Sequence, residues 1–419
     1  MTSGVTFGTI DQRFADEPLP TGPVDFSKIA FVSTSTGADA AKFPPGEPVR
    51  FTSSDVAFTS KLGTGYLADA VRGVNAQIAP GGQAADITVI RVEEGASAVA
   101  STKLEQTMAN VIAGLSTLKR VPSRINATPR LVGTPGYTAQ KLGSDENPVV
   151  AALPETLAAL LAIAVVDVDD SSRDGAIEAR EAIGSDRIMP VGVAARVFDV
   201  DGTTVITRPM ASRILGLINR VDFQNGGKPF EPFANRQIYG LVNTSRAIEF
   251  DLRDGSVEGQ QLLASEVSIV VRGETDVDGA IADGGFVFIG TDNGATDGDL
   301  WQQIHQVRGA DIIDVEHMRL TRQFLGRKIS AGNAEAWINS LRFNLRDHKA
   351  DDDILGYKTE FKPDQNSPEE VRLGRLTVDL GIEEAPVFRV AKRNVRRYRQ
   401  AVNDLVADIA ARINASTIL

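Results

Sequence analysis

Residues 149–191 read VVAALPETLAALLAIAVVDVDDSSRDGAIEAREAIGSDRIMPV, and this stretch decides the fold class. It predicts a helix over residues 149–163, a strand over Ala164–Val168, a helix over Asp174–Ile183 and a strand over Arg187–Val191. The first strand, AVVDV, has no polar alternation, which is typical of a strand buried on both faces. Strands that alternate with helices of this length predict a mainly parallel sheet.

The flanking sequence extends this pattern before changing it. On the N-terminal side, strands are predicted over Lys28–Ser33, Pro48–Thr52, Asp86–Val92 and Arg130–Gly133, with a helix over Thr102–Leu115. The last third has an α+β pattern: a strand over Phe286–Gly290, helices over Ala310–Gly326 and Ala331–His348, strands over Leu355–Phe361 and Leu373–Leu380, and a terminal helix over Asn394–Ile413.

We therefore predict a multi-domain α/β and α+β protein with extended terminal arms. Its predicted segments are an N-terminal arm over 1–20, an N-terminal segment over 21–118, an outer α/β domain over 119–285 and a C-terminal domain over 286–419.

The first residues form a short alternating pattern, Val5-Thr-Phe7-Gly-Thr-Ile10, which is followed by a proline-rich stretch. A strand at a terminus with no neighbouring strand in sequence leaves its backbone groups unpaired. Two interpretations stay open: pairing with a sheet of another subunit, or a frayed, locally packed terminus.

Composition excludes several kinds of chemistry. The 419 residues include no cysteine, which rules out disulfides, thiolate catalysis and cysteine-bound metals. The three histidines, His305, His317 and His348, have neither i, i+4 spacing nor an obvious acidic partner. The net charge of −11 disfavours a large nucleic-acid surface. With no run of about 18 apolar residues and no secretory signal, we expect a chain made in the cytoplasm without membrane insertion.

A site at the end of the central strand is the main enzymatic alternative. Asp167, Asp169 and Asp170 follow a predicted parallel strand, where ligands of α/β sheets bind, and carboxylates hold Mg²⁺. The favoured interpretation is helix capping, with Ser171, Ser172 or Asp174 as the cap. The segment Gly133-Thr-Pro-Gly136 matches neither a phosphate loop nor a dinucleotide fingerprint. We predict no catalytic residue, metal or cofactor.

Two basic clusters stand out in this acidic chain. The first comprises Arg319, Arg322, Arg327 and Lys328, and its arginines share a helix face opposite apolar residues that include Met318 and Leu325. The second comprises Lys392, Arg393, Arg396, Arg397 and Arg399 at the start of the last helix, where positive charge opposes the helix dipole. Each is either a solvated face or a contact for an anionic partner.

Several motifs resemble contractile tail sheath proteins of the P2-like phage or tail-like bacteriocin type. Their order follows the family across about residues 25–415: Pro48–Ser53, Gly63–Gly65, Leu67–Ala70, Thr88–Gly95 and Thr102–Gly114. Pro129–Gly136 (PRLVGTPG) is similar to the family's P-R-[IL]-x-G-x-P-G segment, and Gly284–Gly290 (GGFVFIG) to its G-[YFV]-x-[FV]-[WF]-G strand. One departure is Ile289 in place of Trp, with Thr291-Asp292-Asn293 in place of an Arg-Thr element.

This resemblance implies a structural role and no enzyme activity. Such proteins form stacked hexameric rings, helically arranged around an inner tube, and contraction drives the tube through a target envelope. Arms would link the subunits, which gives Val5, Phe7 and Ile10 a partner strand. The implied partners are other copies, the tube protein, the baseplate and the tail terminator, in a virion tail or tail-like particle assembled in the host cytoplasm.

The resemblance also gives the basic clusters a hypothesis. Arg319, Arg322, Arg327 and Lys328 would meet acidic residues of the tube, with Lys392–Arg399 as the secondary candidate. Two rival readings remain: a cytoplasmic α/β enzyme that uses Asp167, Asp169 and Asp170, and a capsid or baseplate component that assembles into shells or flat rings.

Overall fold

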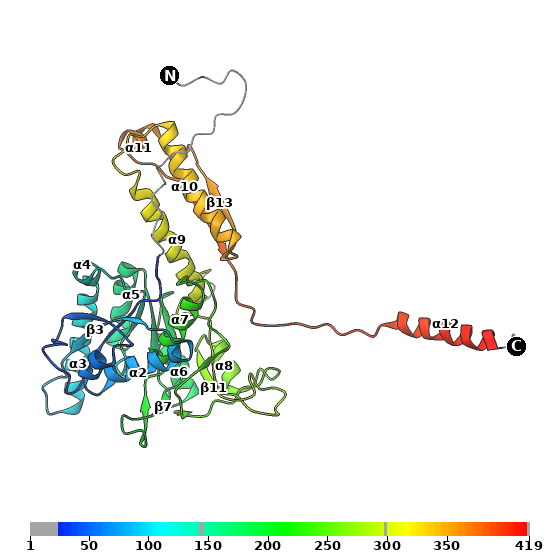
Figure 1. Cartoon of the computed structure of the whole chain (residues 1–419), viewed down its shortest axis with the longest axis horizontal. Helices are drawn as coiled ribbons and strands as arrows, with labels where there is room; N and C mark the ends of the chain where they lie inside the picture. Colours follow the sequence, from blue (N-terminus) through cyan, green and yellow to red (C-terminus); the bar gives the residue numbers. More distant parts are fainter. Residues whose placement is uncertain (1–23, 142–145, 297–299, 417–419) are drawn as a thin grey trace, which may run out of the picture. The chain divides into compact units, whose positions relative to one another are not determined.

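The computed structural model describes residues 24–141, 146–296 and 300–416 (Figure 1). The predicted arm residues Val5, Phe7 and Ile10 lie outside these described residues. The chain divides into a large compact unit that ends at Ala385 and a second unit that begins at Pro386. The two units are described separately.

The core of the large unit is a six-stranded sheet with the order β2-β3-β1-β4-β5-β6. Its strands are β1 (Ile29–Thr34), β2 (Pro48–Thr52), β3 (Asp86–Val92), β4 (Leu131–Gly133), β5 (Ile163–Asp167) and β6 (Ile188–Val191). All neighbours pair in parallel except β2 with β3. The predicted mixed α/β class is confirmed, and the sheet is mainly parallel.

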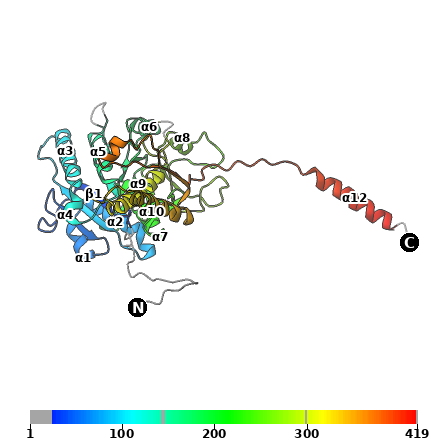
Figure 2. The ribbon, with the colours of Figure 1, turned by 90° about the horizontal axis from the view of Figure 1, so that it is seen from above.

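Helices cover both faces of this sheet (Figure 2). Helices α2 (Tyr66–Ile78) and α7 (Ala211–Gln224) pack together on one face, and α3 (Ala100–Leu118) and α5 (Pro148–Leu160) pack on the other. Every residue of β1, β4, β5 and β6 is buried, as expected for strands covered on both sides.

The sheet unites two segments that the sequence prediction separates. Strand β1 pairs with β3 on one side and with β4 on the other. The predicted border at residues 118/119 therefore lies inside a single sheet, since the strands on both sides of it share one hydrogen-bonded ladder.

Short elements surround the central sheet. Two three-stranded sheets have the orders β10-β7-β8 and β11-β12-β9. Their strands are β7 (Ala195–Phe198), β8 (Val205–Arg208), β9 (Arg236–Ile238), β10 (Asn243–Thr244), β11 (Ile269–Arg272) and β12 (Phe286–Ile289). The remaining short helices are α1 (Val56–Thr59), η1 (Ser60–Leu62), η2 (Ala79–Gly81), α4 (Val121–Ile125), α6 (Arg173–Glu181) and α8 (Glu258–Ala264).

A helical hairpin and a two-stranded sheet complete the large unit. Helix α9 (Ile304–Arg322) packs on α10 (Ala331–Ala350), and α10 packs on β13 (Ile354–Glu360), which pairs with β14 (Asp379–Glu384) (Figure 1). A second hydrophobic cluster packs this hairpin against the rest of the large unit, which we call the body. The cluster includes Phe26, Phe230, Ile313, Leu345 and Ile354.

The strand predicted over 373–380 is wrong over most of its length. Ser367 caps a short helix, α11 (Pro368–Arg372), by accepting from the Glu370 amide, and Gly374 follows with φ +80°. Strand β14 therefore begins only at Asp379.

The described residues of the second unit, 386–416, form one helix, α12 (Arg399–Ser416), preceded by a segment without regular structure. Its apolar residues lie at helical spacing and are exposed: Val402, Leu405, Val406, Ile409 and Ile413. No helix among the described residues is long and apolar enough to cross a membrane.

Candidate functional sites and similarity to known proteins

The aspartates at the end of β5 serve local structure. Asp167 Oδ1 accepts hydrogen bonds from the amides of Met210 (2.7 Å) and Ala211 (3.0 Å), so it caps the start of α7. Asp169 accepts from the Ser171 amide at 3.0 Å. Ser172 caps α6 by accepting from the Gly175 amide at 3.0 Å, as the capping interpretation predicted. Burial raises the pKa of Asp167 to about 7, despite its two amide donors.

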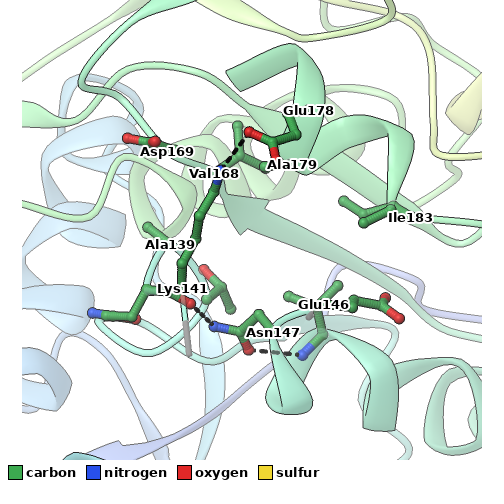
Figure 3. Close-up of a pocket in the computed structure, with 13 residues that line it drawn as sticks. Ala139, Lys141, Glu146, Asn147, Val168, Asp169, Glu178, Ala179 and Ile183 are labelled. Carbon is green, nitrogen blue, oxygen red and sulfur yellow. Dashed lines mark hydrogen bonds and ion pairs between the residues drawn. The ribbon is translucent and has the colours of Figure 1, made fainter. Parts of the chain in front are cut away.

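A cavity of about 260 Å³ lies beside Asp169 (Figure 3). Two of its polar side chains, Lys141 and Asn147, already have partners within the protein. Lys141 Nζ lies 2.7 Å from Glu178 Oε2. Asn147 caps α5 by accepting from the amides of Val149 and Val150, and it donates to the Gln140 carbonyl. Among the described lining residues, no nucleophile lies beside a base.

His348 corrects the expectation that no histidine has an acidic partner. Its Nδ1 lies 2.7 Å from Asp353 Oδ2, and its Nε2 lies 2.7 Å from Glu316 Oε2. The hairpin brings Glu316 against His348 although 32 positions separate them. No pattern in the sequence indicates this pairing, because it depends on how α9 packs on α10.

The residues of the first basic cluster differ in their exposure to solvent. Arg322, Arg327 and Lys328 are exposed at the end of α9 and in the turn that follows. Arg319 is half-buried on α9 and lies near enough to Arg130 to affect it electrostatically. Burial lowers the pKa of Arg130 to about 10, and the charges of Arg319 and Arg187 lower it further.

The hairpin carries more exposed positive charge than the sequence clusters indicated. Arg342, Arg346 and Lys349 are exposed on α10. The apolar face predicted for α9 is wrong at two positions, since Met318 is 57% exposed and Leu325 is 73% exposed. Buried positions of α9 end at His317, so its last turns have no core to pack against.

The second basic cluster lies in the unit that begins at Pro386. Lys392, Arg393, Arg396, Arg397 and Arg399 are all exposed. Residues 386–416 contain seven basic and two acidic residues. Residues 351–385, which contain β13 and β14, have the opposite balance of ten acidic and four basic residues.

Strands β13 and β14 form a sheet with two open edges. Within the described part of the chain each pairs only with the other. Each therefore has one edge of backbone groups available to another strand.

Solved structures of other proteins have a fold similar to that of this chain. The fold is similar to the helical sheath of the anti-feeding prophage in its contracted state (TM-score 0.62, 14% identity, covering 94% of this chain and 99% of that chain). It is also similar to the PVC sheath complex of an extracellular contractile injection system (TM-score 0.64, 12% identity, covering 95% and 100%). The chain thus shares its fold with these sheath proteins.

Similarity in sequence reaches the same family. The tail sheath protein of Escherichia phage P2 is 22% identical over 399 residues, 93% of each chain. A prophage major tail sheath protein of Pseudomonas aeruginosa (strain UCBPP-PA14) is 26% identical over 400 residues, covering 92% of this chain and 95% of that protein. No family model matches. These findings support the contractile tail sheath family, which the motifs of this chain resemble.

The structure gives physical reasons for the PRLVGTPG motif. Arg130 donates to the Leu161 carbonyl and lies over the Phe26 ring at 4.6 Å. A Cβ on Gly133 would lie 2.8 Å from Leu215 and 2.9 Å from Phe31. Gly136 has φ +89°, and a Cβ there would lie 2.5 Å from the Tyr66 ring.

The segment that departs from the family pattern is held by Asn293. This residue is fully buried, and its Nδ2 donates to the carbonyls of Asp186 (2.6 Å) and Trp301 (2.7 Å). Its Oδ1 accepts from the Ala295 amide. Asn293 thus fixes the chain after β12 against the start of β6.

Proposed function

We propose that this chain is the subunit of a contractile tail sheath, which polymerises around an inner tube and shortens to drive that tube through a cell envelope. The observation that carries this function is similarity to tail sheath proteins over 92–93% of the chain, joined to the sheath fold. The protein is structural and not an enzyme. The enzymatic alternative also loses its site, because Asp167 caps α7.

Self-assembly and association with a baseplate are supported by the similar solved structures, whose titles describe a helical sheath, a sheath complex and a baseplate. Stacked hexameric rings, a tail terminator partner and assembly in the host cytoplasm complete the proposal. The particle is a phage tail or a tail-like particle.

The α9–α10 hairpin is the proposed tube contact. Its exposed end carries Arg322, Arg327 and Lys328, and α10 adds exposed cations, in a protein whose net charge is −11. Each exposed ion pair contributes only about 0–1 kcal/mol. A tube that carries an acidic surface would nevertheless be held firmly, because every subunit repeats the contact. Contacts of this strength also break one after another during contraction.

Binding to purified tubes tests this contact. We expect the triple variant Arg322→Gln/Arg327→Gln/Lys328→Gln to bind tubes on the order of tenfold more weakly at low salt. Its affinity should also depend less on salt than that of the unmodified protein. Arg196→Gln is the matched control, because Arg196 is an exposed arginine on β7. Equal decoration of tubes by the triple variant at every salt concentration would overturn the contact.

The open β13–β14 sheet is the proposed acceptor of arms from neighbouring subunits. Residues 386–398 supply a segment without regular structure whose positive charge complements the acidic residues 351–385. Backbone pairing at an open edge gives affinity without a deep pocket. The arm at Val5–Ile10 is the second proposed strand donor.

A further inference from the structure

Four charged side chains of alternating sign meet where the α9–α10 hairpin leaves the body. Lys228 Nζ lies 2.9 Å from Asp353 Oδ2, and the same oxygen lies 2.7 Å from His348 Nδ1. His348 Nε2 lies 2.7 Å from Glu316 Oε2. The row joins four separate segments: the loop after α7, the turn before β13, helix α10 and helix α9.

The geometry requires a charged imidazole. A neutral histidine has one donor and one acceptor nitrogen, whereas both ring nitrogens of His348 face carboxylate oxygens. Only the imidazolium donates to both. The site is also enclosed, since His348 is 5% exposed and its ring lies 5.1 Å from that of Phe230. Loss of the proton would leave one buried carboxylate facing a nitrogen lone pair.

We propose that Lys228, Asp353, His348 and Glu316 form an ionic clasp that fixes the α9–α10 hairpin to the body, and that the hairpin loosens when His348 loses its proton. The clasp residues are positioning residues. The inference rests on this geometry and is independent of the proposed tube contact.

The titration of His348 gives the direction of the effect. Although burial lowers the pKa of His348, its bonds to Asp353 and Glu316 outweigh this and raise the pKa from 6.5 to about 9. A group whose pKa is raised in the closed state stabilises that state fully below the ordinary pKa, and the contribution is lost as the pH rises through the raised value. The contribution of the clasp should therefore be complete below about pH 6.5, remain mostly present at neutral pH, and be lost above about pH 9.

Except for Glu384, the other charged groups around the clasp titrate outside this window. Lys228 has a raised pKa because its bonds to Asp351 and Asp353 outweigh its burial, so it stays charged. The pKa of Asp351 is lowered by Lys228. The pKa of Glu316 is lowered by His348 and Asn344 despite burial, so it stays ionised. Burial lowers the pKa of His317. Glu384 lies on β14 and pairs with Ile354 of β13, and burial raises its pKa to about 7.

Hydrogen–deuterium exchange of the full chain from pH 7.5 to pH 10 tests the clasp, with rates corrected for the intrinsic rate of unstructured peptides. We expect the opening of α10 and the C-terminal half of α9 to increase on the order of tenfold across this range, while α2 and α7 stay protected. His348→Gln should show faster exchange of the hairpin already at pH 7.5, with no further transition.

His317→Gln is the matched control, because it removes a buried, neutral histidine from the same hairpin and should keep the transition. Glu316→Gln is the second variant in case His348→Gln does not fold. It removes one carboxylate from His348 and should move the transition to lower pH. The proposal would be overturned if the unmodified chain showed no transition or if His348→Gln showed the same transition. An unmoved transition in Glu316→Gln would overturn it as well.

Discussion

At the scale of single residues, close packing explains the glycine at position 114. Gly114 on α3 faces β1 and β3, and a Cβ there would lie 2.5 Å from Val32 and 3.1 Å from Val92. Alanine favours a helix over glycine by about 1 kcal/mol, but overpacking a core costs about 1–3 kcal/mol. The steric cost decides, so glycine is required where α3 meets the sheet.

Asp167 gives a test of capping against metal binding. We expect Asp167→Ala to lower the free energy of unfolding by about 1–3 kcal/mol, because the amides of Met210 and Ala211 lose their acceptor. Asp167→Asn keeps an acceptor oxygen and should lose much less. Denaturant unfolding with and without Mg²⁺ measures both effects. Stabilisation by Mg²⁺ that disappears in Asp167→Ala would instead restore the metal-site interpretation.

Residue-level prediction succeeded where one position determines its own environment. The sequence indicated Ser171, Ser172 or Asp174 as the helix cap, and the structure shows that Ser172 caps α6. It did not indicate the partners of His348, because these depend on how α10 packs against α9 and on the turn at Asp353. It also did not indicate that Asp167 caps α7, since that helix begins 44 positions later in the chain.

At the scale of elements, strong apolar runs were predictable and short mixed strands were not. Strand β3 spans Asp86–Val92, as predicted, because a short and mainly apolar run is bounded by polar residues. The helix predicted to Ile163 ends at Leu160, since Leu161 adopts φ +47° although the apolar run continues. Strands β7 and β9 have only four and three residues, which is too short for a periodic pattern to be recognised in the sequence.

Buried ion pairs fasten α9 to the body. The two terminal guanidinium nitrogens of Arg308 on α9 donate to the two carboxylate oxygens of Asp222 on α7. Each of these side chains is 1% exposed. Arg187 and Asp311 form a second bidentate pair. Burial raises the pKa of Asp222 to about 6, although Arg308 acts in the opposite direction. These pairs hold the N-terminal half of α9, and the proposed clasp holds the point where it leaves the body.

A double-mutant cycle tests the first of these pairs. We expect Arg308→Met to lower the free energy of unfolding by about 3–5 kcal/mol, because it leaves Asp222 buried and unpaired. The double variant Arg308→Met/Asp222→Leu should lose far less than the sum of the two single variants. The exposed pair of Arg50 and Asp86 is the control, and Arg50→Gln should cost under about 1 kcal/mol. Additive losses in a denaturant series would show that the buried pair does not act as a unit.

At the scale of the whole molecule, charge separates along the chain in a way that favours assembly. The net charge is −11, but the charge is unevenly distributed. The end of the hairpin and the C-terminal segment are basic, and residues 351–385 are acidic. Surfaces of opposite sign on one chain are complementary between copies, which favours ordered association. The net charge follows from the composition, but the exposure of these charges on separate elements required the structure.

The central claim, that the chain polymerises as a sheath through its arms, is tested most directly by electron microscopy of the purified full chain beside a variant lacking residues 386–419. We predict hollow cylinders or stacked rings for the full chain. We predict none for the shortened chain, whose circular dichroism should still report a folded body because the described core of the large unit ends before Pro386. Small uniform particles of the full chain at every concentration, or cylinders that form equally well without the C-terminal segment, would contradict the account.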